Sequence, residues 1–318
     1  MRSDINYNNI IDNDEARHAQ AAADAAPDLP AEEIDATKFY ITQHFHKYTR
    51  DNHEVWRDLF TRRWDVLEEQ VSRTFIDGLK VLRLSPDRLP LLCDTTLEQD
   101  CEITDGRILK KGTKLEGINR YLAEVSDWSS YGVPGYLPAK SFFACLAARQ
   151  FPTTVLIRPR EVMDYLPEPD IFHDVFGHVP LHASRVFADF LQTYGRAALR
   201  CDDPHHVERL GRLFWFTVEF GLIREDNRLK IYGSGLVSSH GESRYALTGT
   251  WEKQGQSAEP CIERPVPEWR PFDLDRVCET PFEIHHYQPI YYVLESFEQL
   301  RDAMNEYADR VLGVGSAR

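Results

Sequence analysis

The sequence predicts a mainly α-helical domain with short β-strands, an α+β fold that forms one compact unit. Long segments carry apolar residues at spacings of three and four, which is the pattern of helices that bury one face. Strand-like sequence is confined to a β-branched run at Thr153–Pro159 and a short stretch before a glycine turn at Leu229–Ser239. With 318 residues, 42% hydrophobic and 12% aromatic, the chain can bury a large core.

Composition divides the chain into three parts. Residues 1–34 are polar, acidic and rich in alanine, with no face able to bury itself, so we expect a disordered N-terminal tail. Residues 35–312 contain the periodic segments and are expected to form the domain. Residues 313–318 are expected to be a short C-terminal tail.

The expected helices follow from apolar periodicity and from the Gly and Pro residues that interrupt it. The first strong helix is expected from His53 to Leu82 and the last from Ile290 to Val311. Others are expected near residues 89–97, 112–127, 140–150 and 183–199, and from Pro204 onward.

Composition and charge exclude several classes of protein. A net charge of −14 argues against a nucleic-acid surface, which needs clustered Lys and Arg. No stretch approaches the roughly 18 apolar residues of a membrane span, and the N-terminus lacks a secretory signal, so we expect a cytoplasmic protein with no membrane partner. The six cysteines include no C-x-x-C pair, which argues against a zinc or iron–sulfur site built on cysteine.

Candidate metal ligands are concentrated between Tyr165 and His182. His173 and His178 are five residues apart, which at about 100° per residue separates them by about 140° on an α-helix, so a shared metal requires a helix end or a distorted turn. Glu219 is a candidate third ligand, because it is the only ionisable side chain in the apolar run Leu213–Ile223 and would cost several kcal/mol if unpaired. Two His and one carboxylate leave one face of an octahedral ion open, as in non-haem Fe(II) oxygenases.

Spacing alone leaves other roles open. Either His can be a hydrogen-bonded core residue, Glu219 can pair with an arginine, and His182 and Asp174 compete for places beside a metal. A metallohydrolase would want a general-base Glu as in His-Glu-x-x-His, and Asp174 lacks that spacing. A non-catalytic protein with a structural zinc would usually supply four ligands, and only three can be assigned.

Five blocks of sequence follow one another in a recognisable order: Val133–Phe143, Pro167–Leu181, Trp215–Leu222, Tyr232–Glu242 and Gln288–Phe297. With these blocks the chain resembles the pterin-dependent aromatic amino acid hydroxylases, and in particular the bacterial members that act on phenylalanine. The resemblance implies a single catalytic domain, a helical basket around a non-haem iron site. It implies Fe(II) and tetrahydrobiopterin, or a related reduced pterin, as cofactors, and conversion of L-phenylalanine to L-tyrosine with O₂.

The resemblance also assigns roles to residues. It implies that His173, His178 and Glu219 bind Fe(II) and carry the catalysis. Those expected at the pterin are Phe142, which would stack on it, Gly135, Leu137 and Ala139, whose backbone would read its edge, and Asp174. Those expected at the amino acid are Arg158 on its carboxylate, Trp215 as a pocket wall, Ser238 as the partner of a His ligand, and Ile284, where the family sets ring preference.

Two departures from the family concern polar contacts. Leu166 stands where animal members have a Thr that hydrogen-bonds the substrate backbone, and Phe214 where they have a Tyr whose hydroxyl approaches the iron. An apolar Ile284 suits phenylalanine, but tyrosine or tryptophan hydroxylation by the same machinery stays open. Because the chain lacks the regulatory domain and the terminal coiled coil of animal members, we expect a monomer without that control.

Overall fold

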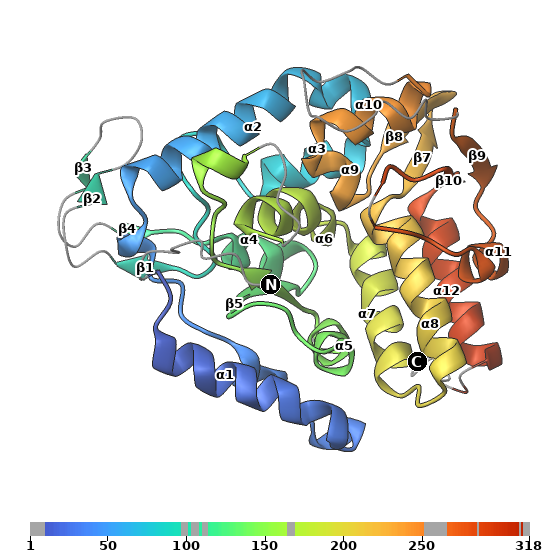
Figure 1. Cartoon of the computed structure of the whole chain (residues 1–318), viewed down its shortest axis with the longest axis horizontal. Helices are drawn as coiled ribbons and strands as arrows, with labels where there is room; N and C mark the ends of the chain where they lie inside the picture. Colours follow the sequence, from blue (N-terminus) through green and yellow to red (C-terminus); the bar gives the residue numbers. More distant parts are fainter. Residues whose placement is uncertain are drawn as a thin grey trace.

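The computed structural model describes residues 10–96, 101–102, 108–109, 114–163, 169–250, 266–284, 286–311 and 313. Helices make up most of this structure, with small sheets between and beside them (Figure 1). The predicted class, mainly helical with short strands, is confirmed. Within the described ranges no helix is both long and apolar enough to cross a membrane.

The helical elements include two π-helices, η6 and η7. The α-helices are α1 (Asn13–Ala25), α2 (Arg50–Gln70), α3 (Arg73–Val81), α4 (Ile118–Val125), α5 (Ala139–Ala147), α6 (Val179–His182), α7 (Arg185–Leu199), α8 (Pro204–Phe214), α9 (Ser234–Ser238), α10 (His240–Thr248), α11 (Leu274–Glu279) and α12 (Phe297–Val311). The π-helices are η6 (Phe172–His178) and η7 (Trp215–Glu219). The 3₁₀ turns are η1 (Ala26–Asp28), η2 (Ala31–Glu33), η3 (Ala36–Phe39), η4 (Phe45–Lys47) and η5 (Arg160–Val162).

The largest described sheet has the strand order β8-β7-β10-β9, in which β10 runs parallel to both β7 and β9. Its strands are β7 (Leu222–Glu225), β8 (Arg228–Ile231), β9 (Glu268–Pro271) and β10 (Ile290–Leu294). The two-stranded sheets pair β1 (Thr95–Thr96) with β4 (Lys114–Leu115), β2 (Cys101–Glu102) with β3 (Ile108–Leu109), and β5 (Ser129–Val133) with β6 (Gln150–Thr154).

Part of the expected disordered tail is ordered. Residues 13–25 form α1, and the Asp12 side chain caps its start by accepting from two backbone N–H groups of the first turn. Ala19 and Ala23 are buried, and Ser141 Oγ of α5 donates to the Ala23 carbonyl at 2.6 Å. An alanine face is small enough to approach a neighbouring helix closely, so a segment without large apolar residues still packs.

The helix expected from His53 to Leu82 is two helices, α2 and α3, separated at Val71 and Ser72. The Ser72 N–H donates to the Ile231 carbonyl of β8 at 2.8 Å. It therefore does not make the i→i−4 hydrogen bond that would continue the helix. The Ser72 hydroxyl then accepts from the Phe75 N–H at 3.3 Å and caps α3. A contact distant in sequence therefore interrupts a periodicity that continues on both sides.

The strand expected at Thr153–Pro159 begins and ends earlier. It is β6, which pairs in parallel with β5 over its whole length. The pairing with β5 ends at Thr154. The Thr154 N–H donates to Asp174 Oδ2 at 2.6 Å and not to a backbone carbonyl of a neighbouring strand. Arg158 consequently lies in irregular backbone after the strand and not at its end.

The final helix expected at Ile290–Val311 is a strand followed by a helix. The first five residues form β10 in the middle of the largest sheet, and α12 begins only at Phe297. A short run of aromatic and β-branched residues suits a buried strand as well as a helix, and apolar spacing alone does not separate the two.

Aromatic packing holds η6 against α2. Phe172 and Phe176 of η6 are stacked with ring centroids 4.6 Å apart. Trp56 of α2 meets Phe172 edge-on at 5.5 Å, and Phe60 meets Phe176 at 5.1 Å. All four side chains are buried, and each contributes about 1.5–3 kcal/mol by leaving water. The segment with the candidate histidine ligands is thus part of the hydrophobic core.

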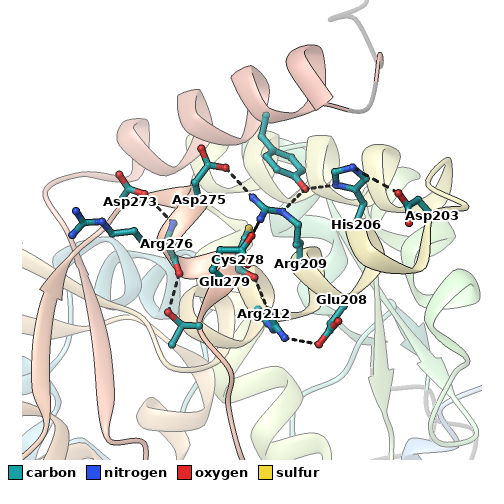
Figure 2. A network of polar contacts seen from close by, with 12 residues as sticks. Asp203, His206, Glu208, Arg209, Arg212, Asp273, Asp275, Arg276, Cys278 and Glu279 are labelled. Carbon is teal, nitrogen blue, oxygen red and sulfur yellow. Dashed lines mark hydrogen bonds and ion pairs between the residues drawn. The ribbon is translucent and has the colours of Figure 1, made fainter.

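A polar network joins α8, α11 and α12, as Figure 2 shows. Arg209 of α8, with a largely buried side chain, pairs with Asp275 at 2.9 Å and with Glu279, both on α11. Its Nε donates to the Tyr307 hydroxyl of α12 at 3.3 Å, and His206 Nδ1 lies 3.0 Å from the same oxygen. Because η7 continues α8 directly, this network anchors the helix that leads to Glu219.

His53 is expected to make the protein acid-sensitive. Its ring is buried among Phe45, Tyr48 and the Leu89 backbone, and burial lowers its pKa to about 4 from 6.5. Between these two pH values the unfolded chain binds a proton that the folded chain does not bind. The free energy of unfolding therefore keeps its His53 contribution above pH 6.5 and loses it as the pH drops from 6.5 towards 4.

Between pH 7 and pH 5 this loss amounts to about 2 kcal/mol, since one pKa unit corresponds to about 1.4 kcal/mol. Urea unfolding at both pH values should show that His53→Gln removes this part of the loss, whereas the exposed control His205→Gln leaves it in place. An equal loss in parent and His53→Gln would contradict the assignment.

Candidate metal centre

The two histidines lie at the ends of one short π-helix. His173 is the second residue and His178 the last residue of η6. A π-helix makes i→i+5 hydrogen bonds and has more residues per turn than an α-helix, so residues five apart come closer to the same side of the helix. This is the distorted turn that the spacing required, and it places the two Nε2 atoms 3.2 Å apart.

The third candidate ligand also ends a π-helix. Glu219 is the last residue of η7, and its Oε1 lies 3.1 Å from His178 Nε2 while its Oε2 lies 3.7 Å from His173 Nε2. The three ligand atoms lie within 4.8 Å of one another. Donors bound at about 2.1 Å to one ion at right angles would be about 3 Å apart, so two nitrogens and one oxygen fit a shared divalent metal.

Burial and charge act on these groups in opposite directions. Burial lowers the pKa of His173 to about 4, which keeps the imidazole neutral and able to bind a cation. Burial would raise the pKa of Glu219, but His178, His173 and the Ser234 hydroxyl together lower it to about 2. At neutral pH the site therefore presents a neutral His173 imidazole and a negative Glu219 carboxylate.

Ser238 fixes the orientation of His173. Its hydroxyl donates to the Ser234 carbonyl at 2.8 Å and lies 3.1 Å from His173 Nδ1. Since the only hydroxyl proton is used on the carbonyl, Ser238 accepts from Nδ1–H and leaves Nε2 free for a metal. The contact between Ser238 and His173 is thus present, and the role of Ser238 beside a metal ligand stays a prediction.

Arg158 is held by a carboxylate that sequence reasoning missed. Asp170 Oδ2 accepts from Arg158 Nε at 2.8 Å and Oδ1 from Nη2 at 2.9 Å, in a pair that is almost wholly buried. Asp170 Oδ1 also accepts from the His173 N–H at 3.0 Å. One carboxylate thus joins the guanidinium to the start of η6, and an acidic residue in a Pro-rich loop gave no sign of this role.

Asp174 and His182 are buried beside the ligands but outside the ligand group. The Asp174 carboxylate accepts from the Thr154 N–H, and burial raises its pKa to about 7. His182 is packed between the rings of Trp128 and Phe151, with centroids 5.0 and 4.9 Å away. Neither residue belongs to the cluster of possible metal ligands in the described part of the chain. A direct bond from Asp174 or His182 to a metal is therefore not supported.

Four of the five residues expected at the pterin, all except Asp174 of η6, lie between the end of β5 and the first turn of α5. Gly135 is in a bend, and a Cβ added to it would meet no atom within 4 Å, so its backbone has an open side. Leu137 is half-buried, and Ala139 begins α5. Phe142 meets Phe214 edge-on at 5.5 Å, and Phe214 in turn lies 6.4 Å from the His178 ring.

The residues expected at the amino acid ring are held by a buried glutamine. Trp215 stacks on Phe282 at 4.4 Å, and its Nε1 donates to Gln288 Oε1 at 3.1 Å. Gln288 Nε2 donates to the carbonyls of Glu283 and His286. The side chain of Gln288 therefore links the segment that contains these two residues to Trp215.

The structure does not test the expectations for Ile284 and Leu166. The Ile284 side chain is 60% exposed, and its place at the substrate ring stays a prediction. Leu166, the first of the two departures from the family, lies outside the described residues.

Proteins of known family resemble this chain over most of its length. Residues 36–313 match the family model of the biopterin-dependent aromatic amino acid hydroxylases. The phenylalanine-4-hydroxylase of Vibrio cholerae is 36% identical over 82% of this chain and 77% of its own length. The tyrosine 3-monooxygenase of Rattus norvegicus is 32% identical over 83% of this chain but 46% of its own length.

Solved structures give the same result. The phenylalanine hydroxylase of Chromobacterium violaceum bound to cobalt superimposes with a TM-score of 0.70 at 34% identity, covering 89% of each chain. A structure of that enzyme with iron(III) and 7,8-dihydrobiopterin superimposes with a TM-score of 0.69 at 33% identity, covering 91% of this chain and 92% of the other. The chain described here belongs to the biopterin-dependent aromatic amino acid hydroxylase family.

Proposed function

We propose that this protein is a phenylalanine 4-hydroxylase that converts L-phenylalanine to L-tyrosine with Fe(II), a reduced pterin such as tetrahydrobiopterin, and O₂. The observation that carries the proposal is the convergence of His173, His178 and Glu219 in a chain of this family. Several bacterial relatives carry the name phenylalanine-4-hydroxylase, and one bacterial phenylalanine hydroxylase has been crystallised with iron and a biopterin.

The ligand set suits iron in an oxygenase. His173, His178 and Glu219 would hold the ion from one side and leave the remaining positions to small molecules. Bound iron and the reduced pterin together would supply the activation of O₂. The chain contributes buried and partly buried aromatic rings, among them Phe142, Phe151 and Phe214, which would limit the access of water to the reacting atoms.

Arg158 is the proposed anchor for the substrate carboxylate. Asp170 and the Met163 carbonyl engage three of its five N–H donors in the described structure. The pair fixes the plane of the guanidinium, and a planar fork recognises a carboxylate through two parallel hydrogen bonds. Trp215 and Ile284 are proposed to border the aromatic ring, and Gly135, Leu137, Ala139, Phe142 and Asp174 the pterin.

The test is anaerobic reconstitution with Fe(II), followed by O₂, tetrahydrobiopterin and phenylalanine. We expect para-tyrosine, identified by mass spectrometry, at a higher kcat/KM than hydroxylation of tyrosine or tryptophan. Faster turnover of either of those amino acids would assign the chain to a different substrate within its family. A zinc-loaded protein that is inert with iron and pterin would overturn the proposal altogether.

The oligomeric state and the location stay predictions. We propose a cytoplasmic monomer, and light scattering of the purified full chain checks the first part. Cell fractionation checks the second.

A further inference from the structure

Ser234 places a hydroxyl among the three metal ligands. Its Oγ lies 2.8 Å from Glu219 Oε2 and 2.9 Å from His178 Nε2. The residue is only 2% exposed, so bulk water does not compete for these contacts. The sequence does not single out this serine, because a serine between two glycines is typical of any turn.

Close backbone packing holds Ser234 in this place. It is the first residue of α9, and the preceding Gly233 donates its N–H to the Gly221 carbonyl at 3.0 Å. A Cβ on Gly233 would stand 2.5 Å from the Glu219 carbonyl, and one on Gly177 would stand 3.2 Å from the Ser234 Cβ. Ser234 is therefore wedged between η6 and η7, the two π-helices that carry the ligands.

The Ser234 hydroxyl has a single proton, so it can donate only one hydrogen bond. Ser234 has one O–H, and the acceptors within reach are Glu219 Oε2 at 2.8 Å, His178 Nε2 at 2.9 Å and the Val218 carbonyl at 3.3 Å. When His178 Nε2 binds a cation its lone pair is used, and a charged carboxylate accepts more strongly than a neutral carbonyl. The proton therefore belongs to Glu219 Oε2.

We propose that Ser234 is a positioning residue of the metal centre, which engages Glu219 Oε2 and leaves Oε1 to bind the ion. This inference rests on the proposed function, since it assumes a bound divalent metal. A carboxylate held in this way binds through one oxygen and leaves a coordination position free for a small molecule. Together with Ser238, which contacts His173, α9 reaches all three ligands from a single helical turn.

Cobalt(II) is a suitable probe, because the bound ion has a visible spectrum that reports its coordination. The metal-free full-length protein is titrated with Co(II), and affinity is measured by competition with a chelator. We expect Ser234→Ala to bind Co(II) about 10–100-fold more weakly, as is usual when an outer partner of a ligand is lost, and to change the visible bands. Ser234→Thr keeps the hydroxyl and should retain the affinity and spectrum of the parent.

Ser239→Ala is the matched control. Ser239 is the residue after α9, and its hydroxyl caps α10 by accepting from the N–H of Glu242, which is not one of the three candidate ligands, at 3.3 Å. Ser239→Ala should lower the thermal stability of the metal-free protein about as much as Ser234→Ala does. It should leave the affinity for Co(II) and the visible spectrum unchanged.

The outcomes separate this inference from the proposed function. If the parent binds no Co(II), both are overturned. If the parent binds Co(II) but Ser234→Ala does so with equal affinity and an unchanged spectrum, only the role of Ser234 is overturned. The same holds if Ser234→Thr behaves like Ser234→Ala, because then the hydroxyl is not what matters.

Discussion

Replacing Glu219 with Gln should abolish hydroxylation while the protein remains folded. The substitution keeps the size of the side chain but removes the only negative charge among the three ligands. Removing one partner of a buried charge pair costs about 3–5 kcal/mol, and about 1.4 kcal/mol is a factor of ten in an equilibrium constant. Fe(II) affinity should therefore fall about 100- to 4,000-fold, which anaerobic titration with a competing chelator measures.

The control for this prediction is Glu242→Gln. Glu242 is also a buried carboxylate, but it accepts from the Gln288 N–H and the Tyr291 hydroxyl and lies outside the ligand group. Its variant should bind Fe(II) like the parent. Parent-like Fe(II) affinity in Glu219→Gln would show that this carboxylate is not a ligand, and the proposed function would lose its main support.

The second large effect is expected for Asp170→Asn. Asp170 is 2% exposed and accepts four hydrogen bonds, three from Arg158 and one from the His173 N–H. An amide accepts at only one of its two terminal atoms and leaves the buried guanidinium unpaired, which costs about 3–5 kcal/mol. Urea unfolding of the metal-free protein should show this loss.

The same variant should bind phenylalanine poorly. An unsupported Arg158 no longer presents its plane to a carboxylate, so we expect KM for phenylalanine to rise more than kcat falls. Asp58→Asn is a suitable comparison, because Asp58 pairs with Arg160 at 2.8 Å on the surface and such pairs are worth about 1 kcal/mol or less. If both Asp variants lose equal stability and keep the same KM, the pair of Arg158 and Asp170 has no special role.

The group of candidate metal ligands could be predicted from sequence because these side chains are unusual in their surroundings. Glu219 is a lone carboxylate in an apolar run, and His173 and His178 flank a glycine in a segment that is largely apolar. Such groups need a partner when buried, and a cation satisfies all three together. Ser234 and Asp170 gave no such signal, since serines and aspartates are ordinary in turns and loops.

By itself the sequence predicted the helical class, the candidate ligands and the family, because all three depend on which side chains occur and how they are spaced. The tertiary structure decided where helices stop and which small polar groups meet the ligands. The break at Ser72, the end of β6 at Thr154 and the strand at Ile290–Leu294 each depend on a hydrogen-bond partner far away in the chain. Local spacing carries no information about such partners, so these features appear only when the chain has folded.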